Sequence, residues 1–385
     1  MLIETTNIMA ENKHIEAKIN QTLVLKTIRL NYGISRIRIA GELGLNRSTI
    51  THIVNELLQR GLVCEVPFNQ DSVCSAGRKP IGLGVNGMAG SVLGLEWQNE
   101  YIRYVLMDFS GKILFQSREE CLHVDVASFS ASVKRIIKAA GTRTNIAVKG
   151  VGVGIPGRID PHKGLVLQSL PMRMHGIALA AELEAELGVP VLIENDANCF
   201  AWGEIREKRA ELKNILCLML EFHHSTDDSF FDQEIGMGIV QNGQVYHGSH
   251  YSSGELKSAL VPYAQSKNFL KLIRRDDKYL FPLSEQEEGT IREYISSLFM
   301  ALMPVISVLD PEKVILGGEF CTISSYIPEI LTKLPKMTEW SFSKRKEYEV
   351  AYGSASYFME RLFTPPVYEK NNRNKPVFWD KVFRS

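Results

Sequence analysis

The segment "IENDANCFAWGE", residues 193–204, changes from apolar to polar within one residue. The apolar run that begins at Val189 reads as a buried strand, and polar side chains follow it at once: Glu194, Asn195, Asp196 and Asn198. Polar groups are costly to bury unless they contact something. The carboxyl ends of strands are where α/β sheets bind ligands, and an aspartate there is a candidate general base. The segment therefore predicts a ligand site, either catalytic or inherited from an enzyme.

The length and composition of the chain indicate a soluble globular protein of two or three domains. It has 385 residues, of which 45% are hydrophobic and 23% are charged. We find no run of about 18 apolar residues, which predicts no membrane span. The first residues contain acids and lack an apolar segment, so we expect no signal peptide and a cytoplasmic location. The six cysteines form no Cys-x-x-Cys pair, which favours reduced thiols.

Three helical patterns lie near the N-terminus. We expect a helix at residues 15–31, a second at 35–43 that ends at Gly44, and a third that starts after Asn46 and ends at Gly61. We expect the Asn46 side chain to cap the third helix by accepting from its free backbone N–H groups. The third helix has an apolar stripe at helical spacing: Ile50, Ile53, Val54, Leu57 and Leu58. Two short helices joined by a glycine-containing turn predict a helix-turn-helix.

The other face of the third helix is suited to DNA. It offers hydrogen-bonding side chains without an acid, and we take these as candidate DNA contacts: Asn46, Arg47, Ser48, Thr49, Thr51, His52 and Asn55. Residues 1–85 contain ten Lys and Arg against seven Asp and Glu, a net charge of +3 that permits nucleic-acid binding. The alternative is a helical hairpin with a solvated polar face.

A β-wing is predicted after the third helix. The segments "LVCEV" and "IGLGV" can pair around a loop that contains Gly77-Arg78-Lys79-Pro80. Arg78 and Lys79 lie in a thin, cationic segment that can enter a narrow minor groove. A plain solvated turn is the alternative.

From Gly87 onward the chain alternates strands and helices in two similar halves. The first half has strands in 91–117, a helix at 126–140, a glycine-rich strand, a helix at 176–188 and the strand before Glu194. The second half has a strand, a hairpin that turns at Asn242-Gly243, a helix at 286–309, the strand "EKVILGGEF" and a helix at 353–363. This order predicts a duplicated α/β fold with a cleft between two lobes. We place the boundaries at 1–86, 87–195, 196–365 and a packing tail at 366–385.

These motifs resemble the ROK family of repressors, open reading frames and sugar kinases. The resemblance rests on "GVGVGIPGRID", "PVLIENDANCFAWGE", "GMGIVQNGQVYHGSHYSSGE" and "DPEKVILGGEF", in this order after a helix-turn-helix. It implies two actin-like, ribonuclease-H-like lobes. The winged helix with "GRKP" resembles the branch of xylose-operon and N-acetylglucosamine repressors.

The resemblance also implies what a kinase would need. In kinases of the family, the residue that matches Asp196 takes a proton from a sugar hydroxyl, and glycine loops hold the phosphates. Here the first loop is "LEWQNEYIR", residues 95–103, with bulky side chains and Glu100, and the second, residues 222–236, is acidic with no glycine before Gly236. Like charge near a triphosphate costs several kcal/mol. We therefore expect no enzyme activity, no cofactor and a vestigial base at Asp196.

The resemblance implies a sugar site that this chain keeps only in part. The candidate ligand residues are Gly154, Pro156, Gly157, Asn195, Asp196 and Glu255. The family's Gly-Glu-x-Gly-His motif is reduced to Gly254-Glu255-Leu256-Lys257-Ser258, and no cysteine lies between Cys217 and Cys321, so we expect no zinc site. The family's sugar-binding asparagine is also absent, because residues 160–194 contain none. An empty, purely structural cleft is the alternative to a ligand pocket.

We expect a homodimeric DNA-binding transcriptional regulator, acting as a repressor of sugar-related genes. Its partners would be a double-stranded operator and a sugar or sugar-derived effector, with no membrane contact. Two alternatives remain at this point. One is an ATP-dependent sugar kinase with a fused DNA-binding domain, and the other is a ligand-independent regulator whose cleft is vestigial.

Overall fold

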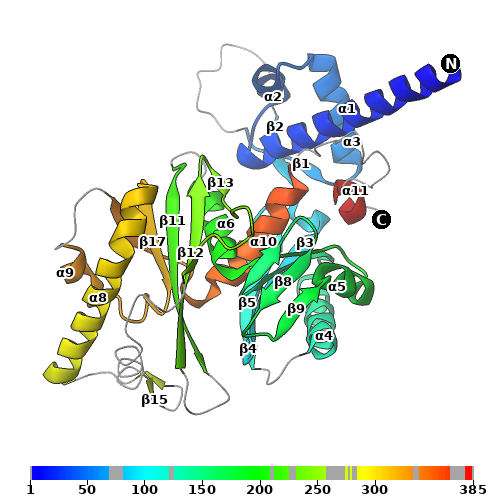
Figure 1. Cartoon of the computed structure of the whole chain (residues 1–385). Helices are drawn as coiled ribbons and strands as arrows, with labels where there is room; N and C mark the ends of the chain where they lie inside the picture. Colours follow the sequence, from blue (N-terminus) through cyan, green and yellow to red (C-terminus); the bar gives the residue numbers. More distant parts are fainter. Residues whose placement is uncertain are drawn as a thin grey trace.

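The computed structural model describes residues 2–68, 81–120, 125–208, 212–224, 231–256, 274–275, 278–279, 284–332, 338–364 and 378–383. Two α/β lobes lie side by side, and a small domain built from the N-terminal residues sits on the first of them (Figure 1). The long first helix projects from that domain, and the short C-terminal helix lies next to it.

The N-terminal domain is a winged helix-turn-helix. It contains α1 (Leu2–Leu30), α2 (Arg36–Leu43), α3 (Arg47–Gln59) and the antiparallel strands β1 (Val63–Val66) and β2 (Gly82–Val85). The predicted apolar stripe of the third helix is confirmed, with Ile50, Ile53, Val54 and Leu57 buried. They pack with the last turns of α1 in one core.

The ends of these helices agree with the sequence in all but one respect. Gly44 and Gly61 both adopt positive φ, and the N–H of Leu62 reaches back to the Leu57 carbonyl at 3.0 Å, as in a Schellman ending. Asn46 is the N-cap residue of α3, but its exposed side chain makes no capping hydrogen bond, so that prediction was wrong. Its backbone carbonyl alone starts the helix, accepting from Ile50 at 3.1 Å.

Several helix boundaries also differ from prediction: the helix predicted at 126–140 ends at Thr144, and the one predicted at 353–363 begins at Glu349 and ends at Leu362. The first helix starts at Leu2 rather than at residue 15, and no glycine or proline interrupts residues 2–30. The helix predicted at 176–188 begins at Leu179, because residues 174–177 pair with β8 as a strand.

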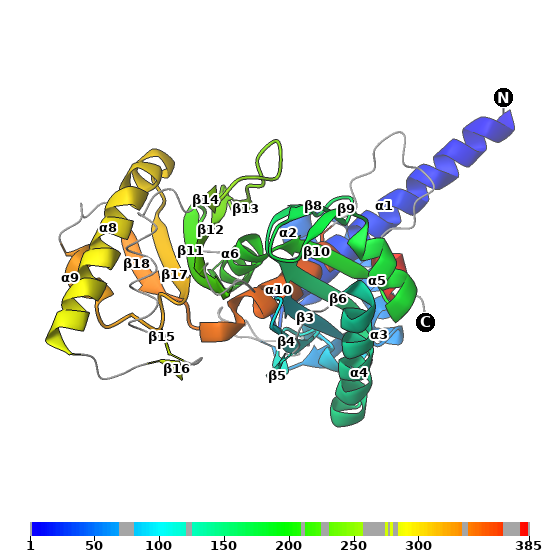
Figure 2. The same ribbon diagram turned by 60° about the horizontal axis from the view of Figure 1, so that its bottom comes forward.

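The first lobe is built on a five-stranded sheet in the order β10-β6-β3-β4-β5. β3, β4 and β5 form an antiparallel meander, and β6 and β10 add in parallel to β3. Helices α4 and α5 cover one face (Figure 2), and a small sheet of three strands stands at the edge. The bounds are β3 (Ser91–Trp97), β4 (Tyr101–Asp108), β5 (Ile113–Glu120), α4 (Val126–Thr144), β6 (Val148–Ile155), β7 (Arg158–Asp160), β8 (Leu165–Ser169), β9 (Met174–Ile177), α5 (Leu179–Leu187) and β10 (Val191–Asn195).

The second lobe repeats this topology, which confirms the predicted duplication. Its sheet has the order β18-β17-β11-β12-β13, with β17 and β18 parallel to β11, β12 antiparallel, and β14 also paired with β12. The bounds are β11 (Ile215–His224), β12 (Phe231–Gln241), β13 (Gln244–Val245), β14 (Glu255–Leu256), α8 (Glu285–Leu309), β17 (Lys313–Gly318), α9 (Ile327–Leu331) and β18 (Glu339–Phe342), with a two-stranded piece formed by β15 (Arg274–Arg275) and β16 (Lys278–Tyr279).

Helix α8 is long and apolar enough, by length and composition alone, to pass as a membrane span. In this fold one side of it is part of the second-lobe core, where Ile291, Ile295, Leu298, Phe299 and Leu302 are buried. The repeated topology explains why this side of α8 is buried, because α8 forms the crossover before β17 as α4 does before β6. We therefore describe α8 as a core helix of the second lobe.

Two helices cross between the lobes. α6 (Asp196–Lys208) follows the last strand of the first lobe and packs on β11 and β12 of the second, whereas α10 (Glu349–Leu362) follows the last strand of the second lobe and packs on β3 and β6 of the first. They also pack on each other (Figure 2). The predicted boundaries assign α10 to the second lobe, although its contacts are with the first-lobe sheet. Those boundaries stay predictions.

Glycines allow α10 to approach the first-lobe sheet this closely. A Cβ at Gly94 would lie 2.1 Å from the Ala351 carbonyl oxygen, and one at Gly152 would lie 2.2 Å from that of Ser354. Neither position has room for a side chain. The glycine-rich strand "GVGVGIPG" is therefore in part a packing surface for α10.

The N-terminal domain and the first lobe share one continuous hydrophobic core. It contains side chains from α1, α3, the first-lobe sheet and α10, and also Val382 of α11 (Phe378–Phe383). Phe383 packs edge-on against Phe109 with ring centroids 5.5 Å apart, and Lys381 pairs with Glu184 at 3.5 Å. The C-terminal helix thus packs on the first lobe of its own chain.

Candidate functional site

The candidate DNA-contacting face of α3 is open to solvent. Asn46, Arg47, Ser48, Thr51, His52 and Asn55 are exposed, and Thr49 is half-buried. Thr51 donates its hydroxyl to the Arg47 carbonyl at 2.8 Å, one turn back along the helix. The buried stripe holds the helix on the domain, and the opposite side presents these polar groups.

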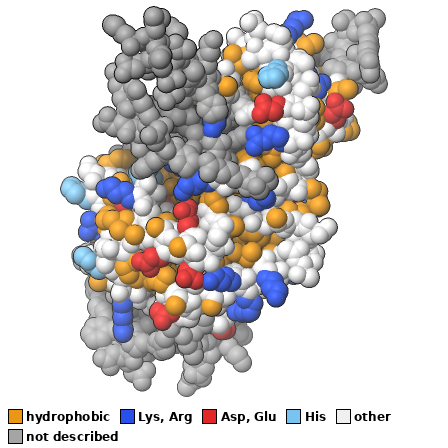
Figure 3. All heavy atoms as spheres, turned by 90° about the vertical axis from the view of Figure 1, so that its right-hand side faces the viewer, with side chains coloured by type: hydrophobic (Ala, Val, Ile, Leu, Met, Phe, Trp, Pro, Cys, Tyr) orange, Lys and Arg blue, Asp and Glu red, His pale blue; other side chains and the backbone are white. Residues whose placement is uncertain are grey.

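The wing carries the other two predicted contacts. Strands β1 and β2 pair as expected, with Val63 opposite Val85 and Val66 opposite Gly82. Arg78 and Lys79 lie in the loop between them, outside the described residues. On the face drawn in Figure 3, Lys and Arg are mixed with Asp and Glu among the described residues.

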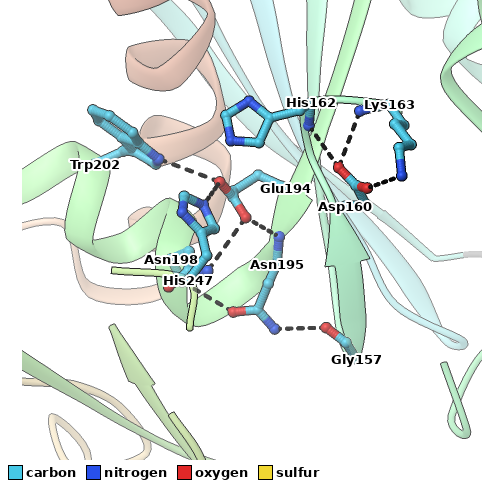
Figure 4. A network of polar contacts seen from close by, with 9 residues as sticks. All are labelled: Gly157, Asp160, His162, Lys163, Glu194, Asn195, Asn198, Trp202 and His247. Carbon is cyan, nitrogen blue, oxygen red and sulfur yellow. Dashed lines mark hydrogen bonds and ion pairs between the residues drawn. The ribbon is translucent and has the colours of Figure 1, made fainter. Parts of the chain in front are cut away.

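The polar residues after β10 form a buried network between the lobes (Figure 4). Asn195 donates from Nδ2 to the Gly157 carbonyl at 3.0 Å and to Glu255 Oε1 of the second lobe at 3.2 Å. Its Oδ1 accepts from the backbone N–H of Asn198 at 3.0 Å and so caps α6. The structure thus brings together three residues that the sequence selected: Gly157, Asn195 and Glu255.

Asp196 begins α6 and is buried. Its Oδ1 accepts from the backbone N–H of Ala197 at 2.7 Å, at the helix end where backbone N–H groups favour a negative charge. This position suits a structural carboxylate as well as a proton acceptor.

The three candidates near the β6 end have different roles. Gly157 has a φ of 109°, and a Cβ there would lie 2.4 Å from the Gln168 carbonyl oxygen, so this turn requires glycine. Pro156 is buried beside it. A Cβ at Gly154 would instead lie 2.5 Å from Val350 and 3.0 Å from Cys199, which indicates a packing role beneath α10 and α6.

Two residues that the sequence did not select complete the network. Glu194 is fully buried and accepts from Asn195 N at 2.8 Å, from Asn198 Nδ2 at 3.3 Å and from Trp202 Nε1 at 3.4 Å. His247 of the second lobe lies 2.8 Å from it, Nε2 to Oε2. An acid directly after an apolar run was a signal for Glu194, whereas His247 reaches it only through the fold of the second lobe.

A second buried acid lies in the same row of the sheet. Glu96 of β3 and Glu194 of β10 are both register partners of Gly154, so the three residues face α10 and α6 together. Glu96 accepts from the Tyr101 hydroxyl at 3.1 Å and pairs with Arg103 at 3.3 Å. Burial and the charge of Glu96 raise the pKa of Tyr101 well above its ordinary value.

The comparisons with known proteins agree with this architecture. The family model "ROK family" matches residues 92–258, and the model "Winged helix-turn-helix DNA-binding" matches residues 19–63. The xylose repressor of Caldicellulosiruptor bescii is 31% identical, over 93% of this chain and 99% of that protein. The chain belongs to the ROK family. The xylose repressor of Bacillus subtilis is 28% identical, over 68% of this chain and 70% of that protein.

Solved structures of ROK proteins share the fold. A ROK family transcriptional regulator, described as a homologue of the Escherichia coli MLC protein, matches with a TM-score of 0.72 and 21% identity over 96% of this chain and 100% of its own. A Streptomyces griseus ROK glucokinase, solved with glucose and AMPPNP, matches with a TM-score of 0.53 and 19% identity over 70% of this chain and 99% of its own. The winged helix-turn-helix and the ROK domain together make this chain a DNA-binding regulator of the ROK family, which confirms the predicted fold class and class of function.

Proposed function

We propose that the chain represses sugar-related genes by binding an operator as a dimer and that a sugar-type ligand, held between the ROK lobes, releases it. The named xylose repressors support the repressor role and the class of ligand. The exposed, acid-free face of α3 carries the proposal, because a helix-turn-helix reads DNA with its second helix in the major groove. Two copies would present two such helices to the half-sites of a pseudo-palindrome.

The ligand is proposed to bind at Asn195, Asp196 and Glu255. Asn195 and Glu255 join the two lobes by a hydrogen bond of 3.2 Å, and Gly157 brings backbone close to both. Amide and carboxylate groups are the donors and acceptors that recognise sugar hydroxyls. A ligand that replaces the hydrogen bond between Asn195 and Glu255 would change how the lobes meet. Only such differential binding can shift the protein between two states.

We infer that this regulator does not transfer phosphate. The support is the network of Glu96, Tyr101 and Arg103, which places an internally neutralised carboxylate and two bulky side chains where family kinases have a glycine turn. A glycine turn lets backbone N–H groups reach the phosphates, and side chains of this size at that place would keep a triphosphate away from them. A kinase with a fused DNA-binding domain is therefore the weaker candidate.

Helix α10 is proposed to carry the signal from the lobes to the DNA. Its first residues lie near Glu96 and α6, and its last turn contacts α1 of the DNA-binding domain. Lys26 and Arg29 of α1 pair with Glu360 at 3.6 and 4.0 Å. A shift of the second lobe that displaced α10 would therefore move the surface on which the winged helix-turn-helix packs.

The test begins with genomic fragments selected on the purified chain. Fluorescence anisotropy then measures the affinity for the best fragment with D-xylose, other monosaccharides and their phosphates. We expect at least one sugar to lower the affinity, and we expect no effect of that sugar on an Asn195→Ala variant. Affinity that no sugar changes would reject the ligand role, and sugar phosphorylation with ATP and Mg²⁺ would reject the absence of phosphate transfer.

A further inference from the structure

His247 makes a close side-chain contact between the buried end of β10 and the second lobe. It follows β13, and its Nε2 lies 2.8 Å from Glu194 Oε2. The Glu194 side chain is completely buried and that of His247 is 17% exposed. Figure 4 shows the imidazole directed at this carboxylate from the side of the second lobe.

The other partners of Glu194 are all N–H donors. They are the backbone N–H of Asn195, the side-chain amide of Asn198 and the indole of Trp202. These donors all point at the oxygens of Glu194, so the site is built around a hydrogen-bond acceptor. A buried carboxylate without a positive partner is costly, and His247 is the titratable group that contacts it among the described residues.

The surroundings of His247 on the other elements also favour a positive charge. Asp160 of the first lobe acts on it electrostatically, and that carboxylate is paired with Lys163 at 3.4 Å. The rings of His162 and Tyr251 lie 6.1 and 6.3 Å away, and Tyr251 hydrogen-bonds to Asp160. On the same loop, the carbonyl of His250 accepts from Arg158 at 3.1 Å. Asp196 and Cys199 of α6 and Tyr357 of α10 are further titratable groups around Glu194.

We propose that protonated His247 is a positioning residue. Through its contact with Glu194, it holds the second lobe against the first-lobe network that carries Asn195 and Asp196. Glu194 accepts from Asn195 on one oxygen and from His247 on the other, so the imidazolium fixes the carboxylate that fixes the segment. Loss of the proton weakens this clamp and lets the lobes separate. The inference concerns the lobes alone and needs neither DNA nor a sugar.

The direction of the pH effect follows from the surroundings. Burial lowers the pKa of His247, but the hydrogen bond and the charge of Glu194, with that of Asp160, raise it above the ordinary 6.5 overall. The charged pair therefore contributes fully below pH 6.5 and is lost as the pH rises through the raised pKa. The closed form should weaken toward alkaline pH.

Single-molecule energy transfer between dyes on the two lobes tests this inference. Encoded dye attachment at Thr142 and Ser307, both exposed, reports the distance between the lobes without using the native thiols. For the native chain we expect the low-transfer, open population to grow several-fold between about pH 6 and about pH 9. An open population that is constant over this range would overturn the proposal without any variant.

Three variants assign the effect to one side chain. His247→Gln cannot carry a charge, so it should be open at every pH, whereas His247→Lys stays charged and should remain closed at alkaline pH. His162→Gln is the matched control, because His162 is an exposed neighbour whose ring lies 6.1 Å from that of His247. It should behave as the native chain does. A native-like pH response in a folded His247→Gln protein, or loss of the response in His162→Gln, would contradict the clamp.

Discussion

Arg29, near the end of the first helix of the DNA-binding domain, donates from Nη1 to the carbonyl of Met359 in α10 at 3.3 Å. Its guanidinium also lies 4.5 Å from the centroid of the Phe363 ring. The helix that the arginine contacts begins next to Glu96, between the two lobes. The Arg29 side chain therefore connects the winged helix-turn-helix domain to α10, the helix that lies between the two lobes.

Arg29→Ala should uncouple the two parts. Without the contact to Met359, we expect specific DNA affinity to remain within a few-fold of the native value, because the α3 face is unchanged. The response of that affinity to an active sugar should shrink. Anisotropy titrations with and without the sugar measure both quantities. Arg38→Ala, which removes an exposed pair within α2, serves as control and should keep the full response. A full response in Arg29→Ala would reject this route.

The close approach of α10 to the first-lobe sheet predicts the effect of a single methyl group. Gly152→Ala would place a Cβ 2.2 Å from the Ser354 carbonyl oxygen and should cost about 1–3 kcal/mol or more in the free energy of unfolding. Gly141→Ala in α4 meets nothing within 4 Å and should be neutral or stabilising by up to about 1 kcal/mol. Chemical denaturation compares the two. Equal effects would show that α10 does not pack as described.

Glu349, the first residue of α10, should make stability depend on pH. Burial raises its pKa to about 8 from an ordinary 4.5. The folded state then holds a proton that the unfolded state releases, so stability falls as the pH rises from 4.5 to about 8, by at most about 1.4 kcal/mol per pH unit. Glu349→Gln should remove most of this slope. Thermal melts across that range measure it, and the same slope in the variant would exclude Glu349 as its source.

Asn195 should contribute to stability as well as to binding. Asn195→Ala removes the acceptor that caps α6 and should lower the free energy of unfolding by about 1 kcal/mol. Asn195→Asp keeps an acceptor for the cap but loses the amide that donates to Gly157 and Glu255. It also places a buried carboxylate opposite Glu255, so we expect it to destabilise the protein more than Asn195→Ala does and to lose the response to sugar in thermal-shift measurements. An undiminished response would remove Asn195 from the ligand site.

The sequence predicts local structure well where one pattern has one meaning. The stripe from Ile50 to Leu57 defined α3, and Gly44 and Gly61 ended their helices as expected. Asn46 failed as a side-chain cap because its residue type permits the hydrogen bond but does not compel it. The residues of the ROK motifs gave the order of the strands and the place of the polar network.

Long-range contacts could not be predicted from the sequence in the same way. The packing of Gly154 beneath Val350 depends on a helix almost 200 positions away in the chain, and a glycine in a glycine-rich strand reads equally well as a ligand-facing residue. His247 meets Glu194 only because β13 ends opposite the last strand of the other lobe. Burial of Glu96 beside Arg103 likewise requires the register of β3 and β4.

Selection of genomic DNA on the purified chain tests the central claim most directly. The native protein should enrich a small set of fragments that share an inverted repeat, and a folded variant with both Arg47→Ala and Asn55→Ala should lose roughly 10- to 100-fold or more of its affinity for them. If the native chain enriches no fragment over that variant, α3 does not read DNA, and the account of gene repression through operator binding is contradicted.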